Sequence, residues 1–287
     1  MAEQLPHASW RVIRSAPGRG AWNMALDEAI LESSRIGQTP PTLRLYAWSP
    51  PCLSLGRAQP VRDVLLAELE ERGWDLVRRP TGGRAILHTD ELTYSIAGPQ
   101  SEPRLSGGVL DSYRVLAQAL LHALRLLNIP AQALEYPAGS VRLNPASPGQ
   151  NAKTENPVCF EVPSNYEITV YGKKLIGSAQ ARRKEGVLQH GSLPLYGDLA
   201  RITQVLAFED AASREAAAVR LLERAATAEA ILGTPLSWEQ AADAFLAAFA
   251  ETLNLELQPS KPTTEEWRKA EELVGEKYAS TEWTNRT

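Results

Sequence analysis

Apolar and polar residues alternate in short segments through much of the first two-thirds of the chain. Residues 91–98 are the clearest case, because Leu92, Tyr94 and Ile96 fall on one face of an extended strand. The same pattern predicts strands over residues 42–48, 52–56, 75–79, 158–162, 166–170, 174–179 and 187–195, with 166–179 folding as a hairpin around Gly172.

Other segments repeat their apolar residues at helical spacing. Between residues 109 and 127, Leu116, Leu120 and Leu124 share one helix face. We also expect helices over residues 23–33, 61–72, the alanine-rich 211–232, 237–254 and a final segment, the last two opened by the capping boxes Ser237–Gln240 and Thr263–Glu266.

Strands dominate the first two-thirds of this pattern and helices the last third. This order predicts an α/β (α+β) fold, in which a mixed β-sheet is flanked by helices. We find no internal repeat and no domain boundary. We therefore expect a single domain over residues 1–287, with the helical third 198–287 packed on it and no separate accessory domain.

Composition and charge narrow the class of protein. The 287 residues carry a net charge of −4, so no global basic field favours nucleic acid or an anionic membrane as a partner. The sequence begins without a signal peptide and contains no apolar run of membrane-spanning length. We expect a cytoplasmic protein in which Cys52 and Cys159 are free thiols, with a disulfide between them as the less favoured alternative.

Several well-known site motifs are missing from the sequence. It has no P-loop, no Gly-x-Gly-x-x-Gly after a strand, no Gly-x-Ser-x-Gly elbow, and no Cys-x-x-Cys or His-Glu-x-x-His pair. We therefore expect neither a metal nor a cofactor.

One glycine-rich turn is a candidate binding site. The segment 78–84 joins the end of a predicted strand to Gly82 and Gly83, and three arginines accompany them. Glycines let backbone N–H groups approach a ligand closely, and donors that face one way suit an anion or an oxyanion. The alternative is an ordinary surface turn whose arginines are solvated.

Cys159 is a candidate nucleophile. It follows the proline-rich segment 137–157, a long irregular loop of a kind that tends to be functional or disordered. If the strand 158–162 pairs with the hairpin, Lys174 lies beside Cys159, and an ammonium favours the reactive thiolate. The alternative is a buried packing cysteine and a surface lysine. Cys52 is expected to be a packing residue, and His88 and His190 are either bases or structural residues.

The ordered set of motifs resembles a known family. The segments 23–31, 43–59, 78–95, 156–192 and 277–286 are similar to the biotin/lipoate A/B protein ligase catalytic-domain family. Within it they resemble the cysteine-dependent octanoyltransferases of the glycine-cleavage H protein. The resemblance covers nearly the whole chain, and it implies a fold like that of the biotin-protein-ligase and lipoate-ligase catalytic domain.

The resemblance also assigns roles to residues. It implies that Cys159 is the nucleophile and that Lys174 lowers the pKa of its thiol. It implies that the acyl group is bound by Arg79, Thr81, Gly82, Gly83 and Arg84, with His88 behind them, and by Gly177, Ser178 and Ala179.

The implied reaction is octanoyl transfer in protein lipoylation. The donor is octanoyl-acyl carrier protein, the acyl group passes through a Cys159 thioester, and the acceptor is a lysine of a lipoyl domain such as the glycine cleavage H protein. The donor is already activated, so no nucleotide is needed. Separately, we expect the protein to be a monomer. Arg78, Arg79, Arg84, Arg182, Arg183 and Lys184 are predicted to form a basic rim for acidic carriers, unless 182–184 is simply a solvated turn.

Three other functions remain open at this point. The chain could be an amidotransferase that moves octanoyl or lipoyl between lipoyl domains. It could be an ATP-dependent lipoate ligase, although such ligases usually carry a third glycine where this chain has Arg84 and do not depend on the cysteine. It could also be a non-catalytic acyl-binding or carrier-docking protein, which retention of both Cys159 and Lys174 disfavours.

Overall fold

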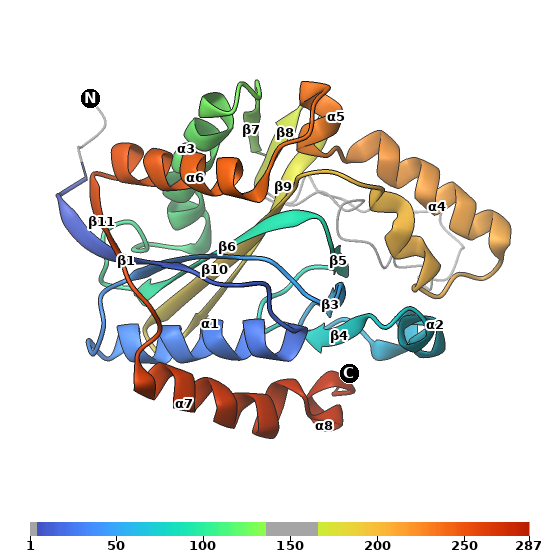
Figure 1. Ribbon diagram of the computed structural model, residues 1–287, viewed down its shortest axis with the longest axis horizontal. Helices are drawn as coiled ribbons and strands as arrows, with labels where there is room; N and C mark the ends of the chain where they lie inside the picture. Colours follow the sequence, from blue (N-terminus) through green and yellow to red (C-terminus); the bar gives the residue numbers. More distant parts are fainter. Residues whose placement is uncertain (1–4, 136–165, 287) are drawn as a thin grey trace, which may run out of the picture.

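The computed structural model describes residues 5–135 and 166–286, and its main feature is a large mixed sheet between two layers of helices (Figure 1). Within those ranges the strand order is β11-β1-β2-β6-β10-β9-β8-β7. Strands β11, β1 and β2 run parallel, and every pairing from β2 to β7 is antiparallel. The strands are β1 (Ala8–Arg14), β2 (Thr42–Tyr46), β6 (Glu91–Pro99), β7 (Gln132–Glu135), β8 (Tyr166–Val170), β9 (Lys173–Arg183), β10 (Gly186–Pro194) and β11 (Leu255–Pro259).

A second, three-stranded sheet packs at one end of the large one. Its order is β4-β3-β5, with β3 parallel to β4 and antiparallel to β5. The strands are β3 (Cys52–Leu55), β4 (Asp75–Arg78) and β5 (Ile86–His88). This small sheet has its own apolar cluster, which includes Leu53, Val205 and Leu221.

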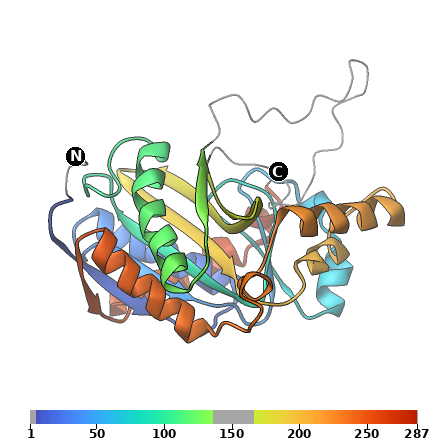
Figure 2. The same cartoon turned by 90° about the horizontal axis from the view of Figure 1, so that it is seen from above.

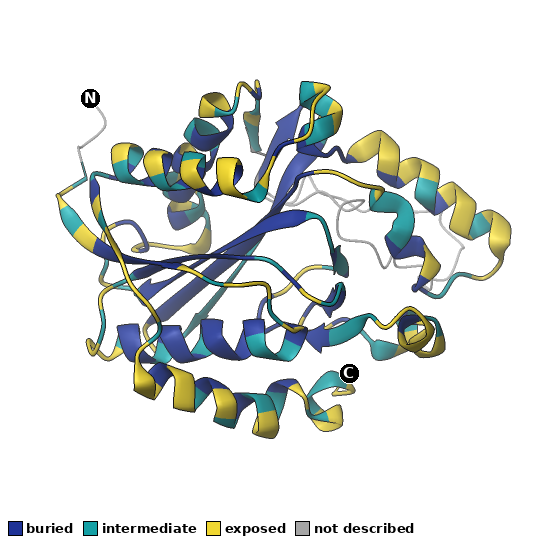
Figure 3. Cartoon of the chain, in the orientation of Figure 1, coloured by how far each residue is buried: buried dark blue, intermediate teal, exposed yellow. Residues whose placement is uncertain are grey.

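Two helix layers cover the large sheet. Helices α3 (Val109–Leu126) and α6 (Trp238–Thr252) lie on one face, and α1 (Gly20–Arg35) lies on the other with α7 (Thr264–Leu273) outside it (Figures 1 and 2). Colouring by burial shows exposed residues on the outer sides of α3, α6 and α7, whereas α1, between the sheet and α7, has none (Figure 3). The remaining helical segments are α2 (Leu66–Glu71), α4 (Ala211–Arg224), α5 (Ala228–Leu232), α8 (Thr281–Thr284), the 3-10 turns Val61–Asp63 and Leu199–Gln204, and the π turn Val274–Tyr278.

Strand alternation decides which side chains meet which layer. In β6, Leu92, Tyr94 and Ile96 enter the core beneath α3 and α6, as the sequence predicts. Ser95 between them faces α1, where it donates a hydrogen bond to Asp27. The same strand therefore supplies apolar packing to one layer and polar contacts to the other.

Two predicted helices are wrong as continuous elements. Residues 61–72 split because Leu65 donates its backbone N–H to the Val205 carbonyl, 2.9 Å away, and the chain extends there. Residues 211–232 split because Ala226 donates to the Lys174 carbonyl at 3.1 Å, after which the Thr227 side chain caps α5. In both places a tertiary backbone contact outweighs local helix propensity.

The remaining predicted elements are confirmed in part. Both capping boxes are confirmed at Ser237 and Thr263. Strands β1, β5, β7 and β11 were not expected, and β11 lies within the predicted helical third. The predicted loop 137–157 and strand 158–162 lie outside the described residues. No helix in the described ranges has the length and apolar run needed to cross a bilayer.

The buried carboxylate of Asp27 ties α1 to the large sheet. It accepts hydrogen bonds from Arg44 Nη1 at 2.7 Å, Tyr46 OH at 2.9 Å and Ser95 Oγ at 2.7 Å. Burial raises the pKa of Asp27, but Arg44 and His190 more than offset it, so the pKa lies below its usual value. The carboxylate is therefore ionised and paired inside the protein.

Replacing Asp27 with alanine is expected to lower the free energy of unfolding by about 3–5 kcal/mol, because it leaves the buried Arg44 charge uncompensated. The control is Asp243→Ala, which removes an exposed partner of Arg14 and is expected to cost at most about 1 kcal/mol. Urea unfolding followed by circular dichroism measures both. Equal losses in the two variants would contradict this role for Asp27.

Candidate active site

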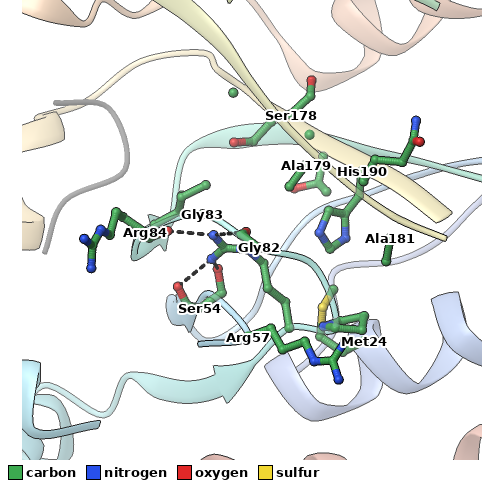
Figure 4. Close-up of a pocket in the computed structure, with 18 of the residues that line it drawn as sticks. Met24, Ser54, Arg57, Gly82, Gly83, Arg84, Ser178, Ala179, Ala181 and His190 are labelled. Carbon is green, nitrogen blue, oxygen red and sulfur yellow. Dashed lines mark hydrogen bonds between the residues drawn. The ribbon is translucent and has the colours of Figure 1, made fainter. Parts of the chain in front are cut away.

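A cavity of about 750 Å³ lies between the large sheet and the small one. Strands β9 and β10 form one wall, and β3, β5 and the turn at residues 80–84 form the other. Figure 4 shows Ser178 and Ala179 on one side of it, with Met24 and Arg57 on the opposite side. The cavity is thus built from segments that are far apart in the sequence.

The turn at residues 80–84 is held in place by arginines that bond to backbone carbonyls. The Arg79 guanidinium donates to the carbonyls of Gly82, Ser54 and Arg84 at 2.7–3.2 Å. Gly83 adopts φ +95°, which favours glycine. A Cβ on Gly56 would lie 1.8 Å from the Gly83 carbonyl oxygen, so the two loops approach each other backbone to backbone.

His190 connects this turn to the Asp27 carboxylate. One ring nitrogen, Nε2, lies 2.7 Å from Thr81 Oγ1, and the other, Nδ1, lies 3.8 Å from Asp27 Oδ2. Burial lowers the pKa of His190, and the neighbouring Asp27 only partly opposes this. A neutral imidazole therefore supports the turn at neutral pH.

His88 belongs to a second buried network on the opposite wall. Its Nδ1 lies 2.7 Å from Glu91 Oε1 and its Nε2 lies 2.8 Å from Ser54 Oγ. The ring stacks on Trp48 with centroids 4.0 Å apart, and the Trp48 indole donates to Thr93. Both ring nitrogens of His88 have partners, so the residue is held in one orientation.

Lys174 is a buried cation on the cavity wall, with 6% of its surface exposed. Its ammonium donates to Glu167 Oε1 at 2.9 Å. Two neighbours fix its backbone. Lys174 pairs with Thr169 of β8 on one side, and the 225–226 segment forms a β-bridge and a hydrogen bond with it on the other. This buried position fits the expectation that Lys174 faces the site better than it fits the alternative of a solvated surface lysine.

Ser178 is positioned by a chain of hydrogen bonds on β9 and β10. Its Oγ lies 2.7 Å from the hydroxyl of Tyr94, which also accepts from Gln189 at 3.1 Å. Burial raises the pKa of Tyr94 to about 12, against the effect of these hydrogen bonds, so this phenol is neutral at physiological pH. Gly191 allows the strands to meet here, because a Cβ would lie 2.6 Å from the Gly177 carbonyl.

The structure brings most of the predicted site residues together. The cavity is lined by Arg79, Gly82, Gly83, Arg84, His88, Lys174, Gly177, Ser178 and Ala179. Thr81 lies behind the lining, where it contacts His190. Arg84 directs its side chain away from His190 (Figure 4). Cys159 lies outside the described residues.

The predicted basic rim is wrong for Arg78, Arg79 and Arg182. Arg78 and Arg79 are buried, and Arg78 donates to the carbonyls of Gly56, Gln59 and Thr284. Arg182 donates to the carbonyls of Leu105 and Gly108. These guanidiniums neutralise backbone dipoles inside the fold, because the connecting loops leave carbonyls without strand partners.

Sequence reasoning missed several residues of the site. Glu167, Trp48 and Glu91 had no assigned role. Glu167 carried a usable signal, since it is a charged residue in a strand whose Ile168 and Val170 enter the core. Period-2 alternation puts it on the opposite face, with Lys174 on the paired strand.

Cys52 is a packing residue, as predicted. Its thiol is free and fully buried, and burial raises its pKa well above the usual value. A Cβ on Gly20 would lie 2.5 Å from its sulfur, so α1 packs directly on it. Such a thiol is a poor nucleophile. In the described part of the chain no group of three or more His, Cys, Asp or Glu residues is arranged to hold a metal ion.

The sequence compares closely with curated bacterial proteins. Residues 19–250 match the model of the lipoyl protein ligase A/B catalytic domain. The chain is 40% identical over 279 residues to octanoyltransferase LipM of Kyrpidia tusciae, covering 97% of this chain and 99% of that one. It is 38% identical over 278 residues to octanoyltransferase LipM of Brevibacillus brevis, covering 96% and 99%.

Solved structures confirm the predicted fold class. A bipartite lipoate protein ligase from Thermoplasma acidophilum superposes with a TM-score of 0.77 at 24% identity, covering 97% of this chain and 96% of that one. Lipoate-protein ligase A bound with ATP gives a TM-score of 0.74 at 24% identity, covering 96% and 98%. At this identity the likeness concerns the fold.

The lowered pKa of His190 predicts a pH dependence of stability. The unfolded chain takes up a proton near pH 6.5, whereas native His190 resists it until lower pH. The stability that neutral His190 contributes is therefore complete above pH 6.5. It is lost as the pH falls toward the native pKa of His190. His190→Gln should flatten the fall in unfolding free energy between pH 7 and 5, by at most about 1.4 kcal/mol per pH unit. Chemical denaturation at several pH values tests this, and parallel curves for both proteins would refute it.

Proposed function

The chain belongs to the lipoyl protein ligase A/B catalytic domain family and is an octanoyltransferase of protein lipoylation, and we propose that it works through a thioester on Cys159. In this proposal octanoyl-acyl carrier protein is the donor. A lysine of a lipoyl domain is the acceptor, the first candidate being that of the glycine cleavage H protein. We further propose that it acts as a single catalytic domain, a monomer, in the cytoplasm.

The observation that carries the proposal is the buried ammonium of Lys174 on the wall of the cavity. A cation in a poorly solvated place favours a neighbouring thiolate over the thiol, and it stabilises negative charge that develops on a carbonyl oxygen. The Glu167 carboxylate holds Lys174 at that wall and offsets part of its charge. The site is therefore suited to transfer of an acyl group from a thioester to an amine, a reaction in which negative charge develops on sulfur and on the carbonyl oxygen.

Two displacement steps account for the transfer. The Cys159 thiolate attacks the thioester carbonyl of the donor, a new carbon–sulfur bond forms, and the carrier leaves as a thiolate that takes up a proton. The neutral amine of the acceptor lysine then attacks the enzyme thioester, an amide forms, and the Cys159 thiolate departs. The proton that the amine releases balances the one that the carrier gained. Exchange of one thioester for another is nearly balanced in energy, and formation of the amide draws the reaction forward.

A transferase also fits the sequence at the glycine turn better than a ligase does. Ligases of this fold usually carry a third glycine where this chain has Arg84, and they activate a free acid with ATP. The curated relatives with 36–40% identity carry the name octanoyltransferase, whereas the ATP-bound neighbour is 24% identical.

The chain should form an octanoyl adduct from octanoyl-acyl carrier protein without ATP or Mg²⁺. Intact-mass spectrometry should find the adduct in the wild type and in Cys52→Ala but not in Cys159→Ser, because Cys52 is buried away from the cavity lining. Addition of an apo lipoyl domain should remove the adduct and label the acceptor lysine. ATP-dependent labelling from free octanoate, with no adduct on Cys159, would instead identify a ligase.

Lys174 and Glu167 should shift the reactivity of Cys159 in opposite directions. Charges about 4 Å apart interact by about 4 kcal/mol at moderate screening. Lys174→Ala should therefore raise the pKa for alkylation of Cys159 by about one to two units, and Glu167→Gln should lower it. Iodoacetamide labelling across pH, followed by peptide mass spectrometry, measures both. If neither variant moves the profile, Lys174 does not act on this thiol.

A further inference from the structure

Three arginines from distant parts of the chain meet beside the turn at residues 80–84. Arg57 follows β3, Arg183 ends β9, and Arg286 lies near the C-terminus after α8. Arg57 and Arg183 both line the cavity, and the side chains of Arg57 and Arg286 are exposed to solvent. Arg57 and Arg183 therefore lie on the cavity wall, and the charge of Arg286 lies close enough to lower the pKa of Arg57.

Contacts with the same turn fix two of these arginines, and a contact with the end of β4 fixes the C-terminal segment. Arg57 donates its backbone N–H to the Thr81 carbonyl at 2.9 Å, and Arg183 Nη2 donates to the Pro80 carbonyl at 3.2 Å. The Trp283 indole donates to the Arg78 carbonyl at 2.9 Å.

Trp283 in turn positions the third arginine. The Arg286 guanidinium carbon lies 4.6 Å from the Trp283 ring centroid. Lys277 Nζ lies 4.4 Å from the same centroid and is paired with Glu28. The C-terminal segment thus adds cations to the cluster formed by Arg57 and Arg183.

Within the described part of the chain, these three charges have no acidic partner. Among residues 5–135 and 166–286, no carboxylate lies within 4 Å of Arg57, Arg183 or Arg286. Arg183 lowers the pKa of Arg57, and burial and Arg286 add to the effect. The arginines therefore repel one another, which costs free energy unless an anion lies between them.

The neighbouring arginines differ in this respect. Arg78, Arg79 and Arg182 each donate to several carbonyls. By contrast, among the residues that the structure describes, the Arg57 side chain makes no hydrogen bond and the Arg183 side chain makes one. Guanidinium donors that remain available suit the planar, bidentate recognition of a phosphate.

We propose that Arg57, Arg183 and Arg286 bind the phosphodiester of the donor's phosphopantetheine arm at the entrance of the cavity. The inference rests on the proposed function, which supplies a donor whose thioester is carried on such an arm. Binding of the phosphate here leaves the thioester end of the arm to enter the cavity toward Lys174. The enzyme would then select carrier-bound acyl groups by binding the phosphate of the arm at these arginines, and not by binding the acyl chain.

The test compares two small donors that differ only in the phosphate, octanoyl-pantetheine and octanoyl-4′-phosphopantetheine. With wild-type enzyme the phosphorylated donor should have the lower KM, and added salt should erase the difference. Each of Arg57→Gln, Arg183→Gln and Arg286→Gln should raise the KM of the phosphorylated donor by roughly three- to tenfold with kcat unchanged. The KM of octanoyl-pantetheine should rise less than that of the phosphorylated donor. Arg183→Gln also removes the hydrogen bond to the Pro80 carbonyl, so the ratio of the two KM values is the readout for each variant. Arg268→Gln, an exposed arginine on α7, serves as the matched control and should affect neither donor.

A binding measurement keeps this test independent of catalysis. Calorimetry with the Cys159→Ser protein should show tighter binding of 4′-phosphopantetheine than of pantetheine, and the three arginine variants should abolish the preference. Equal binding of the two compounds would overturn the inference, as would variants that weaken both donors equally. Arginine-dependent binding of ATP in preference to phosphopantetheine would also overturn it, by assigning the cluster to a nucleotide. Failure of the proposed function is distinct, because it appears as absence of the Cys159 adduct in the wild type.

Discussion

The buried carboxylate of Asp27 is the contact on which the site most depends. It holds α1 against β2 and β6 through Arg44, Tyr46 and Ser95, and it faces His190, which in turn bonds Thr81 in the glycine turn. An ionised carboxylate inside a protein requires such partners, because desolvation without them costs several kcal/mol. The fold and the binding turn are therefore stabilised by one electrostatic network.

The cavity has a second requirement, which is a rigid wall facing Lys174. Arg79 satisfies three carbonyls around the turn, and the absence of side chains lets Gly56 and Gly83 meet backbone to backbone. Arginines that hold carbonyls in this way are unavailable for ligands. In the proposed reaction, positive charge is supplied instead by Lys174 on the opposite wall. In the proposed phosphate site, it is supplied by Arg57, Arg183 and Arg286.

Much of the architecture was accessible from the sequence because burial imposes a period on each element. The alternation of Leu92, Tyr94 and Ile96 identified β6, and the capping box at Ser237 identified the start of α6. The failures came where tertiary contacts outweighed local preference. The 211–232 helix is broken because its backbone pairs with Lys174, and nothing in an alanine-rich segment indicates that partner.

For the site, the sequence by itself determined the kinds of residues and their order along the chain. A glycine turn, a lysine on a hairpin and two histidines were recognisable as candidate chemistry. Only the tertiary structure decided which charges are available. It buried Arg78 and Arg79 against carbonyls, paired Lys174 with Glu167, and brought Arg57 and Arg183 together from positions 126 residues apart. Charge is present in the sequence, but its effect depends on solvation and on neighbours in space, and these exist only once the chain has folded.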